Sequence, residues 1–332
     1  MKSKYFLFII FLVSGVYAEE TAKPQKEKTE IKIKGILEAG FDINNKVNKS
    51  ETDHKKIGNG KIEISARPVK DIKAEFGFEY KHKDSALTID KLYGQYNFTS
   101  LDGIRAGYMK KSFGLEESAG LEERFFHKRS IINDGLEYFG FLGHDLTLQY
   151  RRNLNEKWKL TGGLSWAEDT LRYLQNYSIE YDAKSTNIIL ATIIRHYTVQ
   201  NIITAFVSSL SFKHFRKLYV SEAELTFGSN PAVKYLEERD AFIFGARAQE
   251  YFPIKTKWKA LRQIIPLAEA VVYSEELESR IFETQLRAGL TLGFAKKSAF
   301  QWRNTYGVIS RIEDGERELR RRRFDSEVVV IF

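Results

Sequence analysis

The chain has 332 residues, no cysteine and only five prolines, and its formal net charge is +8. The absence of cysteine excludes a disulfide framework and a thiolate metal site. Acidic and basic residues are interspersed, so the sequence lacks the basic stripe that nucleic-acid binding requires, and we expect no nucleic-acid partner.

The first residues have the layout of a secretory signal. Lys2 and Lys4 precede an apolar run at residues 5–13, which is too short for a membrane anchor of ~20 residues. We therefore predict a signal peptide at residues 1–18, cleaved after Ala18, which leaves 50 basic against 44 acidic residues and a net charge of +6. Residues 19–30 are charged and poor in apolar side chains, and we expect a disordered periplasmic leader there.

From residue 31 onward, apolar and polar residues alternate in segments of about ten, which is the period of a β-strand. In "IKIKGILEAGFDI", Leu37 and Phe41 fall on one face, and Glu38 and Asp42 fall on the other. Residues 72–81, 282–294 and 300–308 repeat the pattern. The mean hydropathy is −0.38, while aromatic residues make up 14% of the chain. Together with export, these features predict a transmembrane antiparallel β-barrel with a lipid-facing apolar side and a polar lumen.

Turn signals set the expected number of strands. Tight polar turns are expected at 68–71, 100–103, 153–156, 182–185 and 296–298, with longer polar loops at 44–60, 111–143, 167–176, 228–240 and 310–320. This spacing predicts an all-β, up-and-down barrel over residues 31–332 with about 16 strands and both termini on the periplasmic side. The alternation is blurred at 187–213 and 251–265, so 14 strands are an alternative.

A soluble β-sandwich or barrel also has short alternating strands. Here the apolar faces are rich in aromatic residues near the segment ends, among them Trp158, Trp166 and Trp302. Such girdles are typical of membrane barrels. We therefore favour the cell outer membrane as the location and its lipid as a partner.

Residues 111–143 form the longest expected connection. Phe113, Phe126, Ile132 and Phe141 make it too apolar for a loop that lies wholly in water. Long structured loops are usually functional, so we predict that this loop folds inward and narrows the pore. An external loop that only covers the surface is the alternative.

The run "YGQYNFTSLDGIRAGYMKKSFGLEE", followed by "FFHKRSIINDGL", resembles the phosphate-selective porin O and P family over residues 93–150. The resemblance implies a sixteen-stranded, homotrimeric pore for small anions, phosphate among them, with basic residues along the anion path. The matching positions are Arg105, Lys110 and Lys111 at the strand end and Arg124, Lys128 and Arg129 in the loop. The loop departs from a basic path, because it holds four basic and six acidic residues.

The chain ends on "RRRRFDSEVVVIF", in which Phe324, Val328, Val330 and Phe332 fall on one side of an alternating pattern. Terminal residues are usually frayed, so an ordered apolar end favours a last strand that closes the barrel with Phe332 toward lipid. We expect Phe332 to be needed for membrane assembly, in which the barrel-assembly machinery is the partner.

Counting back from an outward Phe332 places Arg321 and Arg323 in the lumen near the outer mouth, where they would attract anions. It places Arg320 and Arg322 outside, near lipid phosphates. A solvated loop end is the alternative.

No nucleophile elbow, zinc-binding helix or glycine-rich phosphate loop occurs, and the six histidines are scattered. We predict no enzymatic activity, no cofactor and no metal site. The predicted function is an outer-membrane porin for passive diffusion of small hydrophilic solutes, with a preference for anions and phosphate as one candidate. The alternative is a non-conducting structural or adhesin-type barrel.

Overall fold

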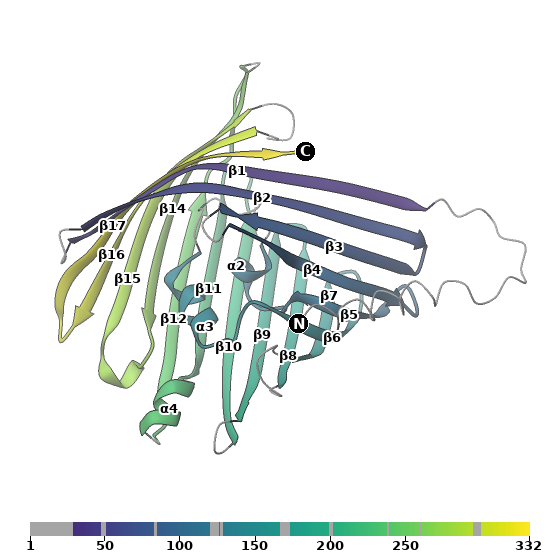
Figure 1. Cartoon of the computed structure of the whole chain (residues 1–332), viewed down its shortest axis with the longest axis horizontal. Helices are drawn as coiled ribbons and strands as arrows, with labels where there is room; N and C mark the ends of the chain where they lie inside the picture. The colour runs from purple at the N-terminus through teal and green to yellow at the C-terminus, as the bar shows by residue number, and fades with distance from the viewer. Residues whose placement is uncertain are drawn as a thin grey trace, which may run out of the picture.

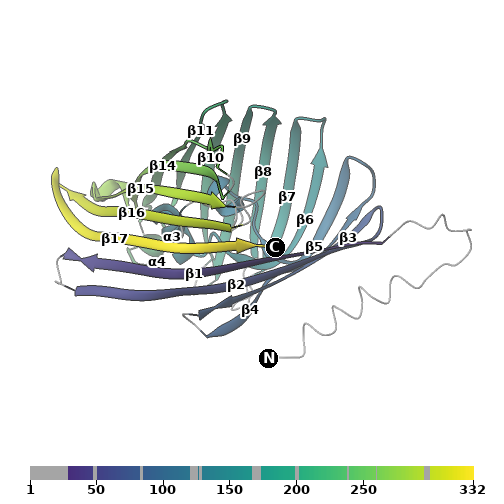
Figure 2. The ribbon, with the colours of Figure 1, turned by 90° about the horizontal axis from the view of Figure 1, so that it is seen from above.

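The computed structural model describes residues 29–47, 51–82, 85–119, 126, 129–166, 173–198, 202–237, 239–258, 260–294 and 300–332. Its strands form one antiparallel sheet that closes on itself, because β1 (Glu30–Lys46) pairs with both β2 (Glu51–Val69) and β17 (Glu316–Ile331). The remaining strands pair with their neighbours in sequence, except that β12 and the short β13 both pair with β14, and Figures 1 and 2 show the resulting ring of strands. These strands are β3 (Ile72–Lys81), β4 (Ala86–Asn97), β5 (Asp102–Lys110), β6 (His144–Asn153), β7 (Trp158–Trp166), β8 (Tyr173–Ala183), β9 (Thr186–Thr198), β10 (Ile202–Phe215), β11 (Val220–Ser229), β12 (Phe242–Tyr251), β13 (Ile254–Lys255), β14 (Leu261–Ser274), β15 (Phe282–Phe294) and β16 (Phe300–Glu313).

The barrel has sixteen strands, as the alternation predicts. The short β13 continues β12, because both pair with β14 and only Phe252 and Pro253 separate them. Proline lacks the N–H group that a strand ladder needs, so Pro253 interrupts the strand without ending it. The fourteen-strand alternative is wrong.

The two faces of the strands carry the predicted chemistry. In β1, Leu37 and Phe41 are 53% and 46% exposed on the outside, whereas Glu38 and Asp42 are 4% and 2% exposed toward the lumen. Trp158 and Trp166 lie at the two ends of β7. A closed barrel also pairs the backbone groups of each strand, which is what a hydrocarbon environment requires.

Two expected long loops are strand hairpins instead. In place of a loop at 44–60, β1 runs to Lys46 and β2 begins at Glu51. In place of a loop at 310–320, Asp314 and Gly315 form a tight turn with φ angles of 50° and 83°. At the β1–β2 connection, Lys46 Nζ lies 3.3 Å from Glu51 Oε2, and this ion pair joins the two strand ends. The charged strand ends therefore continue beyond the apolar belt.

The remaining long connections are also partly ordered. Residues 228–240 hold α4 (Pro231–Glu237), and residues 111–143 hold α2 (Leu115–Ser118) and α3 (Ile131–Tyr138), which lie within the ring of strands (Figures 1 and 2). Among the described residues, no helix is long and apolar enough to cross a membrane. The predicted signal peptide and all but the last two residues of the predicted leader lie outside the described residues, and Glu30 is already the first residue of β1.

Candidate pore and its lining

The described residues of the loop at 111–143 lie in the lumen and are fixed there by an apolar cluster. Phe113, Leu136 and Phe141 are completely buried. They pack with side chains that point inward from β8 to β14, namely Leu174, Ala191, Ile193, Ala205, Val207, Ile243, Val271 and Tyr273. One wall of the lumen is therefore apolar where the loop covers it.

Polar contacts fix the same loop. The Ser130 side chain accepts a hydrogen bond from the Asn133 N–H and so caps α3, while its own N–H and hydroxyl donate to Glu116 at 2.7 and 2.5 Å. Burial favours protonation of Glu116, but the charges of Arg247 and Arg287 and the Ser130 donors outweigh it, so the pKa of Glu116 is lowered. Glu116 is therefore held as a carboxylate.

Two wall residues also bind the end of the loop. The Tyr197 hydroxyl donates to the Phe139 carbonyl at 2.7 Å, and the Arg195 guanidinium donates to the Gly140 carbonyl. Gly140 has a φ of +70°, a left-handed conformation that suits glycine. The loop thus has a defined position across the lumen.

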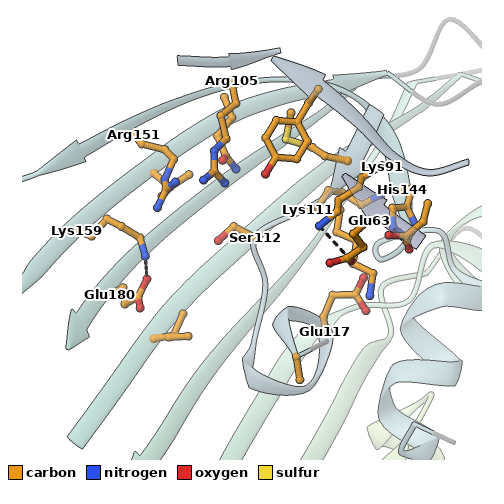
Figure 3. A pocket seen from close by; sticks show the side chains of 18 of the residues that line it. Glu63, Lys91, Arg105, Lys111, Ser112, Glu117, His144, Arg151, Lys159 and Glu180 are labelled. Atoms are coloured by element: carbon orange, nitrogen blue, oxygen red, sulfur yellow. Dashed lines mark hydrogen bonds and ion pairs between the residues drawn. The ribbon is translucent and has the colours of Figure 1, made fainter. Parts of the chain in front are cut away.

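A cavity of about 520 Å³ lies beside the loop, between it and β5 to β7; we call it the β5–β7 chamber (Figure 3). Its described lining holds seven basic side chains (Lys61, Lys91, Arg105, Lys110, Lys111, Arg151 and Lys159) and four acidic ones (Glu63, Asp90, Glu117 and Glu180). The lining is therefore basic on balance.

Several of these basic side chains are neutralised by carboxylates that lie close to them. Lys61 lies 2.7 Å from Glu63 and 2.9 Å from Asp90, and Lys159 is paired with Glu180. Such pairs contribute little field to a passing ion, because each cation has its own anion.

Arg105 and Arg151 are different. Arg105 Nε donates to the Gln95 side chain at 2.7 Å, and its guanidinium lies 5.4 Å from the centre of the Tyr93 ring. Arg151 makes no ion pair within the part of the chain that the structure describes, and the charge of Arg105 acts on it. Figure 3 shows the two guanidinium groups side by side, projecting from β5 and β6 into the chamber. Two half-buried cations therefore lie together without a bonded carboxylate.

A second cavity, of about 640 Å³, lies between α3 and strands β14 to β17 and β1; we call it the β16–β17 chamber. Its described lining holds six basic side chains (Lys46, Arg129, Arg311, Arg320, Arg321 and Arg323) and three acidic ones (Asp134, Glu275 and Glu283). Arg320 was expected to face outward. It lines this chamber because a β-bulge opposite Ile309 and Ser310 inserts one extra residue and reverses the alternation.

The predicted anion-path residues have different surroundings. Arg105 and Lys110 line the β5–β7 chamber, and Arg129, Arg321 and Arg323 line the β16–β17 chamber, where Arg129 lies 2.5 Å from Glu117 and Arg323 lies 2.7 Å from Asp42. Arg124 and Lys128 lie outside the described residues.

Lys111 is only 2% exposed, and its Nζ lies 2.6 Å from Asp145. Burial lowers the pKa of Lys111 against the pull of that carboxylate. Arg151 was not among the predicted residues, although the alternation of β6 places it on the inner face between Tyr150 and Arg152.

Phe332 follows the last residue of β17 and extends its pairing with β1. Its N–H donates to the Gly35 carbonyl at 3.0 Å, and its carbonyl accepts from the Gly35 N–H at 2.8 Å. The ring is 68% exposed and lies over Gly35, where an added Cβ would come within 2.2 Å of it. Glycine at position 35 therefore makes room for the terminal ring.

No family model and no curated protein matches the chain. Solved structures do match: an anion-selective porin from Comamonas acidovorans (TM-score 0.68, 9% identity, 92% of this chain and 100% of that one) and the outer membrane channel DcaP of Acinetobacter baumannii (0.64, 10%, 94% and 100%). A third is OmpT, an outer membrane protein of Vibrio cholerae, in its trimer form (0.63, 11%, 92% and 100%). At these identities the likeness shows the fold. The chain has the sixteen-stranded barrel of outer-membrane porins, and the narrower resemblance to phosphate-selective porins is not confirmed.

Proposed function

We propose that this protein is an outer-membrane porin through which small hydrophilic solutes diffuse passively, with a preference for anions. It would reach the outer membrane after cleavage of its signal peptide and act as a homotrimer without enzymatic activity. The porin and trimer descriptions of the structural neighbours support this proposal.

The observation that carries the anion preference is the pair Arg105 and Arg151. A guanidinium stays charged at any physiological pH, and within the described residues neither of these two is bonded to a carboxylate that would cancel its field. For an anion about 8 Å from each group, at an effective dielectric constant of about 40, each charge contributes about 1 kcal/mol. Each arginine then favours an anion about fivefold, and the contacts stay weak enough for the ion to leave.

Zero-current potentials in planar bilayers under a potassium chloride gradient test this proposal. The wild-type pore should prefer chloride, and Arg105→Gln with Arg151→Gln should reduce the permeability ratio about 25-fold, the product of two fivefold effects. The variant Arg216→Gln with Lys217→Gln, at two exposed positions of the turn between β10 and β11, removes the same charge outside both chambers and should leave the ratio unchanged. A phosphate gradient in parallel measures whether phosphate passes more readily than chloride.

Three results would contradict the proposal in different ways. A wild-type preference for potassium would leave a porin without anion preference. Unchanged selectivity in the arginine variant would remove this pair as its source. Absence of conductance from a heat-modifiable, folded barrel would favour the non-conducting alternative.

A further inference from the structure

Two neighbouring turns at one end of the barrel share an unusual surface. We call residues 215–219, 252–258 and 260–262 the basic turn pair; Lys259 lies outside the described residues. Its two halves are in contact, because the rings of Tyr219 and Phe252 lie 5.9 Å apart. The hairpin between β13 and β14 projects at the end of the barrel where the C-terminus lies (Figure 1).

The basic turn pair carries cations that are free of ion pairs. Arg216, Lys217, Lys255, Lys257 and Arg262 are all exposed, and none makes an ion pair within the described residues. No acidic residue occurs in either segment, and Glu250, the nearest in sequence, is bonded to the Ser221 hydroxyl. Turns farther round this end contain acids, such as Asp71, Asp102 and Asp182, whereas the next connection along the chain, at 295–299, holds Lys296 and Lys297 and no acid. The positive charge is therefore concentrated on one side of this end of the barrel.

Apolar side chains lie among these cations. Leu218 and Trp258 are 73% and 67% exposed, and Ile254 is 52% exposed. The strand register places Ile254 opposite Ile264, which in turn lies opposite Leu292 of β15. The turn pair thus begins where the apolar belt of the barrel ends. Exposed apolar and aromatic groups at this level suit the boundary between hydrocarbon and headgroups.

We propose that the basic turn pair binds the phosphate groups of anionic phospholipids in the leaflet at this end of the barrel. The inference rests on the membrane location in the proposed function and is independent of the anion preference. The guanidinium of arginine binds two phosphate oxygens at once in a bidentate contact, and the lysine ammonium attracts phosphate as a point charge. Trp258 and Leu218 enter the adjoining acyl region. A protein or cell-wall partner in water would satisfy the cations but would not account for apolar groups level with the belt.

Trp258 provides a reporter for this binding. The other three tryptophans, Trp158, Trp166 and Trp302, are replaced by phenylalanine, and the full barrel is folded into phosphatidylcholine vesicles. A small, equal mole fraction of brominated phosphatidylglycerol or brominated phosphatidylcholine then quenches the fluorescence of Trp258. We expect phosphatidylglycerol to be enriched around Trp258 at least about fivefold, the effect of one full contact, and the enrichment to fall in high salt.

Variants separate the turn pair from general charge effects. Replacing its five cations by glutamine, in a barrel that also carries Lys259→Gln, should bring the enrichment to about one, and Lys255→Gln with Lys257→Gln should lower it in part. Lys55→Gln with Lys56→Gln, an equal charge change at other exposed positions, should leave it unchanged.

Equal quenching by the two lipids in the parent barrel would overturn the proposal, as would an enrichment that survives in the five-glutamine variant. Absence of quenching by either lipid would place the turns in water and overturn it as well. If the three-phenylalanine barrel does not fold, thermal unfolding provides the same decision with all tryptophans present. The wild type should then gain stability in phosphatidylglycerol over phosphatidylcholine vesicles, and the five-glutamine variant should not. Conductance in neutral lipid tests the porin proposal separately.

Discussion

The apolar anchor of the inward loop can be weakened at Leu136. This side chain is completely buried between α3 and the barrel wall, and Leu→Ala at such a site costs about 2–5 kcal/mol. A loss of about 3 kcal/mol lowers the docking equilibrium by roughly 100-fold. The backbone hydrogen bonds of the closed sheet do not depend on this side-chain cluster. The lost free energy should therefore weaken the docking of the loop and leave the barrel folded.

Leu136→Ala should therefore make the loop accessible to proteases and raise the single-channel conductance, with more noise from loop motion. Limited proteolysis of the folded protein and planar-bilayer recordings measure the two effects. Tyr138→Ala is the matched control, because Tyr138 belongs to the same helix but is 82% exposed. If Leu136→Ala behaves like the control in both assays, the apolar cluster does not hold the loop. If the barrel itself loses heat-modifiability, the assumed independence of loop and sheet is wrong.

Three further predictions concern single residues. The pKa of Glu116 is lowered below 4.5, so the contribution of its carboxylate to loop docking is complete above pH 4.5 and is lost as the pH falls toward the lowered pKa. Pepsin cleavage of the loop should rise over that acidic range. Glu116→Gln should abolish this pH dependence. Deleting Phe332 should reduce the amount of heat-modifiable barrel in the outer membrane, and normal assembly without it would contradict its closing role. Lys111→Ala leaves Asp145 without its ion-pair partner and should destabilise the protein by about 3–5 kcal/mol in thermal unfolding. Unchanged stability with altered ion selectivity would contradict this structural role and show that Lys111 acts on the passing ion.

Alternation was enough to predict the barrel because each strand must satisfy two solvents at once. The contrast between Leu37 and Glu38, adjacent in β1, is set by lipid on one side and the lumen on the other. The same reasoning would have found Arg151, which the alternation of β6 places inside. The resemblance to phosphate-selective porins instead indicated basic residues at the end of β5 and in the loop at 111–143, and Arg151 lies in neither.

The blurred alternation of residues 187–213 has a physical cause that only the structure supplies. Ile193 and Val207 point into the lumen and are completely buried there, because the loop covers them. The inner face of this wall therefore became as apolar as the outer face. A sequence pattern cannot distinguish such a wall from a strand buried on both sides until the partner of its inner face is known. The bulge that turns Arg320 inward is equally invisible to counting, since it shifts the alternation by one residue.

Total charge is a poor guide to the selectivity of this lumen, because most of its cations are cancelled locally. Lys61 and Lys159 of the β5–β7 chamber are paired with Asp90 and Glu180, and Arg323 of the β16–β17 chamber is paired with Asp42. Such pairs order the wall and add little to the field along the pore axis. The charges that can act on a passing ion are those left without a carboxylate. Arg105 and Arg151 lie side by side and both meet that condition. These two residues would therefore affect ion selectivity more than the larger number of paired bases around them.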